Sequence, residues 1–371
     1  MSKKILVTGG AGFVGSFLVD ELINQGHDVR ILDNLDPQVH PEGTPSFLNK
    51  EAEFINGDIT NKNTLKKALG GIEIISHQAS VVGVGQSMYQ IEHYVRNNTL
   101  ATSMLLDLLV NTNHDVKKLI IAASMSSYGE GSYECEDCGT IEPELRTEEQ
   151  MKKGDWEIHC PNCSKPAKPM PTKETKTQNT NSIYAITKKD QEDMSINIGK
   201  TYGIPVTALR YFNVYGPRQS LNNPYTGVAA IFMSRIKNNN APIIYEDGLQ
   251  TRDFISVHDI IKANILSMEN SKADYETFNV GTCSPITIRS IAETLAKLYG
   301  KDIKPVITNK FRKGDVRHCF ADITKIKSKL GFKPETNFEE GMKELIEWSS
   351  GVKAEDKFEQ ATKELTTKGL I

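Results

Sequence analysis

The stretch KKILVTGGAGFVG, from Lys3 to Gly15, decides the fold class of this chain. An apolar, strand-like run stops at glycines, and Gly9, Gly12 and Gly15 recur three residues apart before a helical pattern begins. In such a turn the first glycine allows the tight bend, the second lets the backbone approach a pyrophosphate, and the third lets helix and strand pack closely. The helix N-terminus adds N–H donors and partial positive charge. We expect a dinucleotide site rather than a packing turn alone.

The segments that follow alternate between strand and helix patterns. Apolar runs predict strands over 28–34, 52–60, 72–80 and 117–124, and a long helix is expected over 89–111. This alternation implies parallel strands joined by right-handed crossovers. The predicted fold is α/β, a Rossmann-type doubly wound parallel sheet with ligands at the carboxyl ends of its strands.

The pattern also predicts how the 371 residues divide into parts. Residues 1–132 and 169–216 should form the dinucleotide-binding domain, interrupted by an inserted segment at 133–168 that is polar and rich in cysteine. Residues 217–350, where the pattern becomes irregular, are expected to form mainly a smaller C-terminal lobe. Residues 351–371 predict a charged helical tail.

Composition excludes several function classes. A formal charge of -3 gives no electrostatic reason to expect nucleic acid or an anionic membrane as partner. No apolar run approaches about 18 residues, so no membrane span is expected. The N-terminus leads directly into a strand without the apolar region of a signal peptide, and we expect a cytoplasmic protein.

Two acidic residues at strand ends bear on the choice of cofactor. Asp33 ends the second strand, where a carboxylate accepts hydrogen bonds from an adenosine ribose and repels a 2′-phosphate, so NAD is favoured over NADP. Asp58 ends the third strand near the expected adenine position. A plain turn residue is nearly as good an interpretation of Asp58.

The stretch SIYAITKK, from Ser182 to Lys189, places Tyr184 and Lys188 one helical turn apart. A tyrosine with a pKa of ~10 is a poor base at pH 7. We expect the Lys188 cation to stabilise the phenolate and lower that pKa, so that Tyr184 can take and return a hydroxyl proton. Ser124 ends the fifth strand in AASMSSYGEG and can bridge Tyr184 and a substrate oxygen.

Together, several stretches make the chain resemble an extended short-chain dehydrogenase/reductase of the nucleotide-sugar epimerase/dehydratase type. They are TGGAGFVG, ILDNL, GDIT, HQAS, SSYGEG, YAITK, RYFNVYGPRQ and QTRDFISVHD. The resemblance covers about Lys4 to Trp348 without the insertion. It implies a tightly held NAD in the Rossmann domain and a substrate-binding role for the C-terminal lobe, mainly residues 217–350. It also implies a nucleotide-diphosphate sugar as substrate (a UDP- or dTDP-sugar) and a homodimer.

The resemblance also assigns residues by position. Its catalytic residues fall on Ser124, Tyr184 and Lys188. Its cofactor contacts, which include Tyr184 and Lys188, fall otherwise on Gly9, Gly12, Phe13, Val14, Asp33, Asn34, Asp58, Ile59, Gln78, Ala79, Asn98 and Tyr211. Its substrate contacts fall on Ser126, Asn213, Val228, Tyr245, Arg252, Arg312 and Asp315. Arginines suit a diphosphate because the guanidinium bonds two oxygens at once, and Tyr245 can stack on a base.

The residues after Ser124 bear on the reaction. Sugar dehydratases similar to this chain carry Asp-Glu there as acid and base, whereas this chain has Met125 and Ser126. The expected activity is therefore epimerisation at C4 through a transient 4-keto sugar. The stretch 216–232 is most similar to UDP-glucose, UDP-glucuronate and dTDP-rhamnose 4-epimerases. A 4-reductase, a UDP-uronate decarboxylase and a non-catalytic NAD-sensing protein that docks a partner through the insertion remain alternatives.

The insertion carries two Cys-x-x-Cys pairs, Cys135 with Cys138 and Cys160 with Cys163. This spacing predicts a zinc-ribbon-like segment with four thiolate ligands; an iron–sulfur centre or a redox dithiol is the alternative, and the neighbouring His159 is a further candidate ligand. Four thiolates leave no open coordination position, so the zinc should be structural. We expect the ribbon to pack near the mouth of the active site or against a partner subunit.

Overall fold

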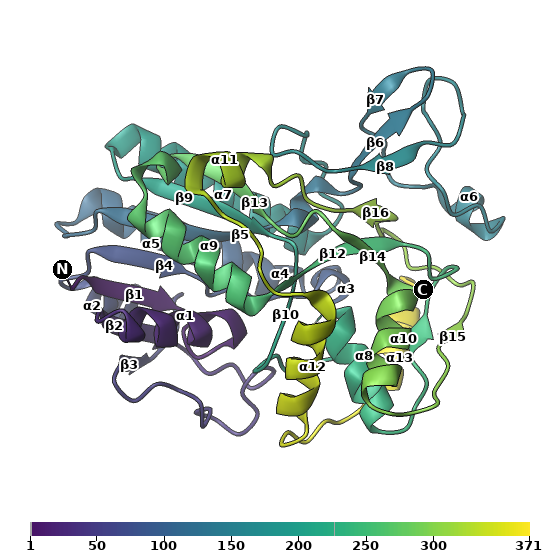
Figure 1. Cartoon of the computed structure of the whole chain (residues 1–371). Coiled ribbons are helices and arrows are strands. Elements are labelled where there is room, and N and C mark those ends of the chain that lie inside the picture. The colour runs from purple at the N-terminus through teal and green to yellow at the C-terminus, as the bar shows by residue number, and fades with distance from the viewer. Residues whose placement is uncertain (1, 226) are drawn as a thin grey trace.

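The computed structural model describes residues 2–225 and 227–371, and its centre is a seven-stranded parallel sheet in the order β13-β9-β5-β4-β1-β2-β3 (Figure 1). The strands are β1 (Lys4–Thr8), β2 (Asp28–Asp33), β3 (Glu53–Asn56), β4 (Ile74–His77), β5 (Lys118–Ser124), β9 (Val206–Tyr211) and β13 (Glu276–Val280). The order runs outward from β1 in both directions, which creates a crevice at the carboxyl ends of β1 and β4. The predicted doubly wound sheet is confirmed.

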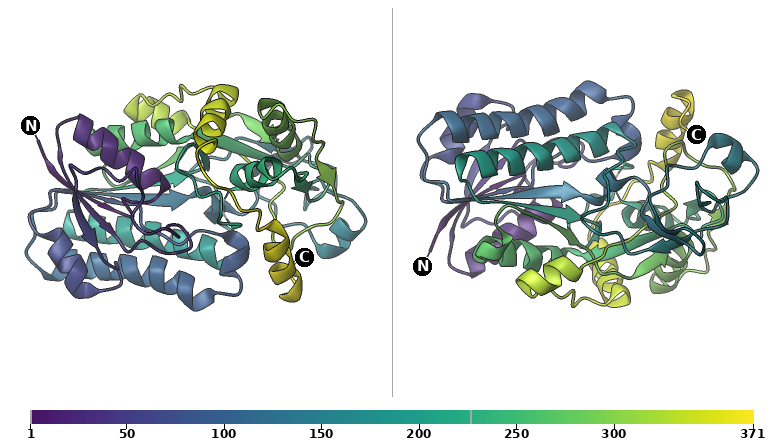
Figure 2. Two further views of the ribbon diagram at one scale, coloured as in Figure 1. Left: turned by 90° about the horizontal axis from the view of Figure 1, so that it is seen from below. Right: turned by 90° about the horizontal axis from the view of Figure 1, so that it is seen from above.

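Helices cover both faces of this sheet, as the two views in Figure 2 show. One face carries α1 (Phe13–Asn24), α9 (Val257–Glu269) and α11 (Thr324–Leu330); the other carries α2 (Lys62–Leu69), α5 (Ala101–Asn111) and α7 (Ile183–Tyr202). Two separate apolar cores result, one on each side, built around Leu18 and Ile260 on the first face and Leu65 and Leu105 on the second. Among the described residues, no helix is long and apolar enough to cross a bilayer.

The long helix expected over 89–111 is formed in three consecutive pieces. After the short helix α3 (Val84–Ser87), the chain continues through α4 (Ile91–Tyr94), a π-helical turn η1 (Val95–Leu100) and α5. Such widened turns occur frequently at functional sites, because they redirect one side chain within an otherwise regular helix. Here the turn contains Asn98, which is fully buried and contacts two other segments.

A smaller lobe lies beyond the carboxyl ends of the central strands, on the right in Figure 1. Its strands are β10 (Asn213–Tyr215), β11 (Ile243–Ile244), β12 (Thr251–Ser256), β14 (Pro285–Thr287), β15 (Val306–Ile307) and β16 (His318–Cys319). Its helices are α8 (Val228–Lys237), α10 (Ile288–Leu298), α12 (Phe338–Ser349) and α13 (Phe358–Thr367). Outside this lobe, short 3₁₀ turns follow β5 at η2 (Met125–Tyr128) and precede β13 at η3 (Ser271–Ala273). The lobe has its own apolar core, which includes Phe232 and Leu295.

The predicted boundary at residue 217 does not follow the sheet. Strand β13 pairs in parallel with β9 and so belongs to the central sheet, and α9 packs against α1 on that sheet's face. The chain therefore returns to the first domain after entering the lobe, which a division by consecutive residues cannot represent.

The insertion folds into a separate antiparallel sheet, β7-β6-β8, which projects from the body at the top right of Figure 1. It contains β6 (Ser132–Cys135), β7 (Gly139–Ile141), α6 (Glu148–Lys152) and β8 (Lys168–Met170), so it runs about two residues past the predicted end at 168. Its apolar cluster has six buried members: Tyr133, Cys135, Ile141, Ile158, Cys160 and Ala167.

Candidate active site

The glycine turn after β1 has no room for a side chain at Gly9 or Gly15. Gly9 has a φ of +69°, and a Cβ there would lie 2.8 Å from backbone atoms of Ala79. A Cβ on Gly15 would lie only 2.1 Å from the carbonyl oxygen of Gly9. Gly12 is the N-cap residue of α1, with no side chain to occupy the helix terminus. The turn thus leaves the N-terminus of α1 at the crevice without a side-chain cap, as an anion site requires.

The Asp33 carboxylate at the end of β2 is fixed by two backbone donors. Its Oδ2 accepts a hydrogen bond from the Ala11 N–H at 3.0 Å, and its Oδ1 accepts one from the Leu35 N–H at 2.9 Å. Next to it, the Asn34 amide donates to Asp58 at 3.1 Å. A carboxylate oxygen has two lone pairs, so Asp33 keeps acceptor capacity toward the cleft that it lines.

Farther along the crevice, polar side chains fix the segment that follows β4. The Gln78 amide donates to the Tyr211 hydroxyl at 3.2 Å. Asn98 does not line the cleft, although the sequence predicts a cofactor contact. Its carbonyl oxygen accepts from the Val81 N–H at 2.8 Å, and its amide donates to the Thr187 hydroxyl at 3.0 Å. Asn98 therefore positions the wall of the crevice from behind.

The three predicted catalytic residues lie together at the carboxyl end of β5. Ser124 is the last residue of β5, and Tyr184 lies in the first turn of α7, whose N-terminus is capped by Ser182. The Ser124 hydroxyl lies near enough to the Tyr184 phenol to lower its pKa. One turn along α7, the Lys188 ammonium donates to the Ala122 carbonyl at 2.8 Å. All three side chains line the same cleft, as predicted.

The prediction that Lys188 lowers the pKa of Tyr184 is wrong when the protein's residues act alone, without the charge of a cofactor. Burial raises the pKa of Tyr184 to about 12, and the nearby Ser124 hydroxyl offsets this only in part. Burial also lowers the pKa of Lys188 to about 7. The cause is common to both: Lys188 is buried and Tyr184 is half-buried in the cleft wall, and loss of water disfavours the charged form of either group.

At the other end of the cleft, Tyr245 and Arg312 form an aromatic–cation pair. The Arg312 guanidinium lies 5.1 Å from the Tyr245 ring centroid, and its Nε donates to the Asp315 carboxylate at 2.9 Å. Arg252 differs from the expected diphosphate ligand in one respect. Its terminal nitrogens donate to backbone carbonyls, including that of Val316 at 2.6 Å, so part of its donor set holds the adjoining loop.

These parts line one cleft of about 910 Å³ between the central sheet and the smaller lobe. Of the predicted cofactor, catalytic and substrate residues, all but Asp58 and Asn98 contribute to its lining. The predicted residues that line it are Gly9, Gly12, Phe13, Val14, Asp33, Asn34, Ile59, Gln78, Ala79, Ser124, Ser126, Tyr184, Lys188, Tyr211, Asn213, Val228, Tyr245, Arg252, Arg312 and Asp315.

The C-terminal tail also lines the cleft, which the sequence analysis missed. Leu365 on α13 and Leu370 after it both face the cavity, and the Leu370 carbonyl accepts a hydrogen bond from the Lys313 N–H at 3.1 Å. The Glu364 carboxylate accepts hydrogen bonds from the hydroxyls of Tyr89 and Tyr225. An amphipathic pattern in the sequence could have predicted this packing, because Phe358, Ala361 and Leu365 lie on one helix face.

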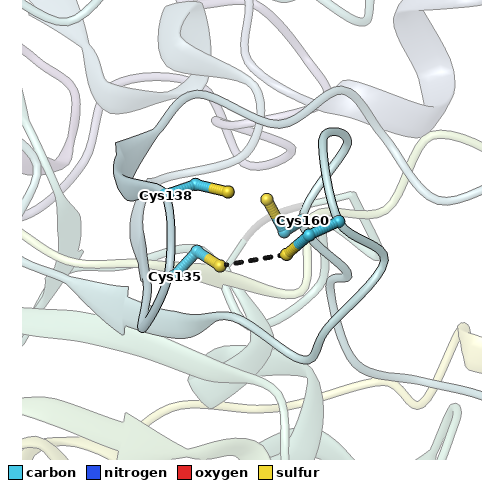
Figure 3. Close-up of side chains that lie close together, drawn as sticks. Cys135, Cys138 and Cys160 are labelled. Atoms are coloured by element: carbon cyan, nitrogen blue, oxygen red, sulfur yellow. Dashed lines mark hydrogen bonds between the residues drawn. The ribbon is translucent and has the colours of Figure 1, made fainter.

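The four cysteines of the insertion converge. Their sulfur atoms all lie within 4.8 Å of one another, and those of Cys135 and Cys163 are 3.4 Å apart. Figure 3 shows the side chains of Cys135, Cys138 and Cys160 directed toward a common centre. Gly139 follows the first pair with a φ of +72°, which allows the tight knuckle. Tetrahedral Zn–S bonds of ~2.3 Å place sulfurs about 3.8 Å apart, so the cluster has dimensions that fit such an ion.

Comparison with known proteins places the chain in a family. Residues 5–150 match a model described as the NAD dependent epimerase/dehydratase family, and residues 166–345 match one described as GDP-mannose 4,6 dehydratase. A dTDP-L-rhamnose 4-epimerase of Burkholderia thailandensis is 32% identical over 353 residues, covering 93% of this chain and 94% of that protein. The chain therefore belongs to the NAD-dependent epimerase/dehydratase family.

Solved structures agree with this assignment. A UDP-glucose 4-epimerase of Thermotoga maritima, determined with UDP-glucose, superposes with a TM-score of 0.76 at 32% identity, covering 94% of this chain and 98% of that one. A UDP-glucose 4-epimerase of Thermus thermophilus, in complex with NAD, gives a TM-score of 0.74 at 26% identity, covering 94% of this chain and all of the other. The predicted family resemblance is confirmed.

Proposed function

We propose that this protein is an NAD-dependent enzyme that inverts C4 of a nucleotide-diphosphate sugar through a transient 4-keto intermediate. One observation carries the proposal: the neighbouring hydroxyls of Ser124 and Tyr184 share a cleft with a glycine turn suited to phosphate at one end and the Tyr245–Arg312 pair at the other. Hydride transfer from the carbon and proton transfer from the oxygen of one carbinol group need this juxtaposition.

The residues around the crevice fit NAD. Gly9 and Gly15 leave space that a Cβ would fill, and the α1 N-terminus faces the same region. Asp33 would hold the adenosine ribose, and its fixed negative charge disfavours a 2′-phosphate. We propose that the predicted cofactor residues lining the cleft contact NAD, while Asn98 and Asp58 hold the surrounding segments.

NAD⁺, when bound, supplies the acceptor for the C4 hydride and a positive ring that favours the Tyr184 phenolate. That charge matters because a phenol with a pKa of about 12 is ionised only about once in 10⁵ molecules at pH 7, a cost of roughly 7 kcal/mol. Tyr184 would take the O4 proton, with Ser124 bridging to the sugar oxygen. Lys188, one helical turn from Tyr184, would contribute its positive charge near the phenol and donate a hydrogen bond to the cofactor ribose.

Epimerisation is favoured over dehydration by the residues next to Ser124. Met125 cannot donate or accept a proton, and the Ser126 hydroxyl donates to Ser124 at 2.9 Å. The match to a dehydratase model covers residues 166–345 and does not include this strand end. A 4-reductase or UDP-uronate decarboxylase would use the same 4-keto sugar, and a non-catalytic NAD sensor would need no Ser124–Tyr184 pair.

We propose that the four cysteines bind one structural zinc ion. The fit of the converging sulfurs supports this, and so does the small apolar cluster of the insertion, which needs a second source of folding free energy. Cys135, Cys138, Cys160 and Cys163 would complete the coordination shell, so no substrate could bind the metal. Such thiols require a reducing compartment, and the proposal includes a cytoplasmic location.

A homodimer is also proposed. Exposed apolar side chains follow one another along α4 and η1, with Ile91, Val95 and Leu100 each more than 40% exposed, and Ile186 on α7 is likewise exposed. Because η1 packs against α7, these residues belong to neighbouring helices and suit a helix-to-helix interface. Light scattering of Val95→Glu against wild type tests this, since the variant should be monomeric.

The direct test is a panel of UDP- and dTDP-sugars incubated with the purified protein and followed by NMR. We expect at least one sugar to equilibrate with its C4 epimer without added cofactor, because NAD is regenerated in each turnover. Net consumption of NADH would instead indicate a reductase, and release of CO₂ a decarboxylase. Absence of any reaction would contradict the proposal.

A further inference from the structure

One arginine of the insertion reaches the lobe that lines the cleft. Arg146 lies between the two cysteine pairs, just before α6, and its side chain is only 1% exposed. Its terminal nitrogens donate to both oxygens of Glu246, each at 2.9 Å. The same guanidinium donates to the Asp315 carbonyl at 3.1 Å and to the Trp156 carbonyl at 3.0 Å. Arg146 thus joins three segments that are far apart in the chain.

Glu246 is held in a backbone conformation that costs free energy. Its φ is 57°, in the left-handed region that non-glycine residues seldom adopt. Its carboxylate accepts from Arg146 and, at 2.9 Å, from Arg317, and its N–H donates to the Lys310 carbonyl at 2.6 Å. Because strain persists only where the surroundings determine the conformation, these ion pairs fix the backbone at Glu246 and at the adjoining Tyr245.

The two groups that Arg146 binds flank the Tyr245–Arg312 pair. Glu246 follows Tyr245 directly, and Asp315 supplies the carboxylate that Arg312 bonds. All four residues line the cleft. The Arg146 guanidinium therefore fixes the spacing between Tyr245 and Arg312, the aromatic and the basic residue at this end of the cleft.

The insertion is attached to the same loop at two further points. The Trp156 and Phe311 rings pack with centroids 6.5 Å apart, and the Lys313 ammonium pairs with Glu148 at 3.0 Å. Both contacts reach residues adjacent to Arg312. The cysteine cluster closes the segment that carries Arg146, Glu148 and Trp156, so a metal there would hold all of these contacts in place.

We propose that Arg146 is a positioning residue for nucleotide recognition, through which the cysteine-bearing insertion sets affinity for the nucleoside diphosphate without taking part in the chemistry at the sugar. The inference rests on the proposed function for the class of ligand. It assigns to the insertion a role at the Tyr245–Arg312 pair of the cleft rather than at the Ser124–Tyr184 pair.

The test compares Arg146→Leu and Arg146→Lys with wild type and with a control, Lys165→Leu. Lys165 makes an exposed ion pair to Asp137 at 2.7 Å within the insertion and lies outside the cleft lining. Isothermal calorimetry with UDP and dTDP gives the nucleotide Kd; kcat and KM come from the epimerase assay; NAD and metal contents are measured on the same samples.

For Arg146→Leu we expect a rise of about tenfold or more in nucleotide Kd and in KM, with kcat within about twofold and NAD and metal contents unchanged. Arg146→Lys keeps the charge but not the two-pronged geometry, so it should show the same direction of change; it also serves if the leucine variant does not fold. The control should match wild type. Unchanged nucleotide Kd in a folded Arg146 variant, or a fall in kcat alone, would overturn the inference.

The two hypotheses fail in different ways. The calorimetric comparison needs no turnover, so a lack of C4 inversion across the sugar panel would reject the proposed reaction while a rise in nucleotide Kd for Arg146→Leu would still support the role of Arg146. Normal epimerisation with an unchanged Kd in both Arg146 variants would reject the role of Arg146 and leave the reaction intact.

Discussion

Replacing Lys188 by methionine should stabilise the protein while abolishing its activity. The pKa of Lys188 falls from 10.5 to about 7 because the ammonium is buried. At about 1.36 kcal/mol for each pKa unit, the buried charge costs roughly 5 kcal/mol at low pH and roughly 4 kcal/mol at pH 7. Methionine fills a similar volume without charge. The lost hydrogen bond to the Ala122 carbonyl offsets about 1 kcal/mol, which leaves a net gain of roughly 3 kcal/mol.

The sign of the pH dependence follows from the direction of this pKa shift. Between pH 7 and pH 10.5 the unfolded chain binds more protons at Lys188 than the folded protein does, so the stability of wild type rises with pH across that window. The Lys188→Met variant lacks this dependence. Its advantage over wild type should therefore be full below pH 7, still large at pH 7, and should shrink toward pH 10.

Thermal melts of nucleotide-stripped wild type and Lys188→Met at pH 7 and pH 9.5 measure this difference. We expect the variant to melt about 5 °C higher at pH 7 and to lose most of that advantage at pH 9.5. Lys189→Met is the matched control, since Lys189 is the next residue on α7 and its ammonium forms a half-exposed ion pair with Asp193. A Lys188→Met variant no more stable than wild type at pH 7 would refute the reasoning.

Three further changes test other parts of the site. Tyr184→Phe should lower kcat by about 10²–10⁴-fold and still retain NAD, and normal turnover would reject the acid–base role. Gly15→Ala places a Cβ 2.1 Å from the Gly9 carbonyl oxygen, so it should destabilise the protein by at least about 1–3 kcal/mol and release NAD; retained NAD and an unchanged Tm would contradict the close packing. A strong zinc chelator, or Cys138→Ser, should remove the metal found by elemental analysis and raise KM more than it lowers kcat; loss of metal with no change in fold or KM would exclude the bracing role.

Local spacing made much of the site predictable from the sequence. The glycine turn follows β1 and opens α1 as expected, and Tyr184 and Lys188 lie one turn apart on α7 in the same cleft as Ser124. These features depend on residues within a few positions of one another and on strands that end at one edge of a sheet. The Cys-x-x-Cys pairs were likewise sufficient to predict that four sulfurs converge.

Features that depend on distant residues were not predictable. Strand β13 joins the central sheet only because the chain returns from the smaller lobe, and Arg146 meets Glu246 a hundred positions along the chain. The pKa of Tyr184 was predicted in the wrong direction because an i, i+4 spacing shows a neighbouring cation but not the enclosure that outweighs it. Leu365 was overlooked because a charged tail gave no indication of what its apolar face covers.

The central claim is that Tyr184 and Ser124 serve a reversible oxidation at C4 of the sugar, and isotope transfer tests it most directly. A UDP- or dTDP-sugar carrying deuterium at C4 is incubated with the protein as purified, in ordinary water, and both epimers are examined by NMR and mass spectrometry. The account predicts that the epimers interconvert while the deuterium stays at C4, because the hydride leaves and returns without exchange with solvent. Loss of the label to water during inversion, or retention of one epimer alone, would contradict it.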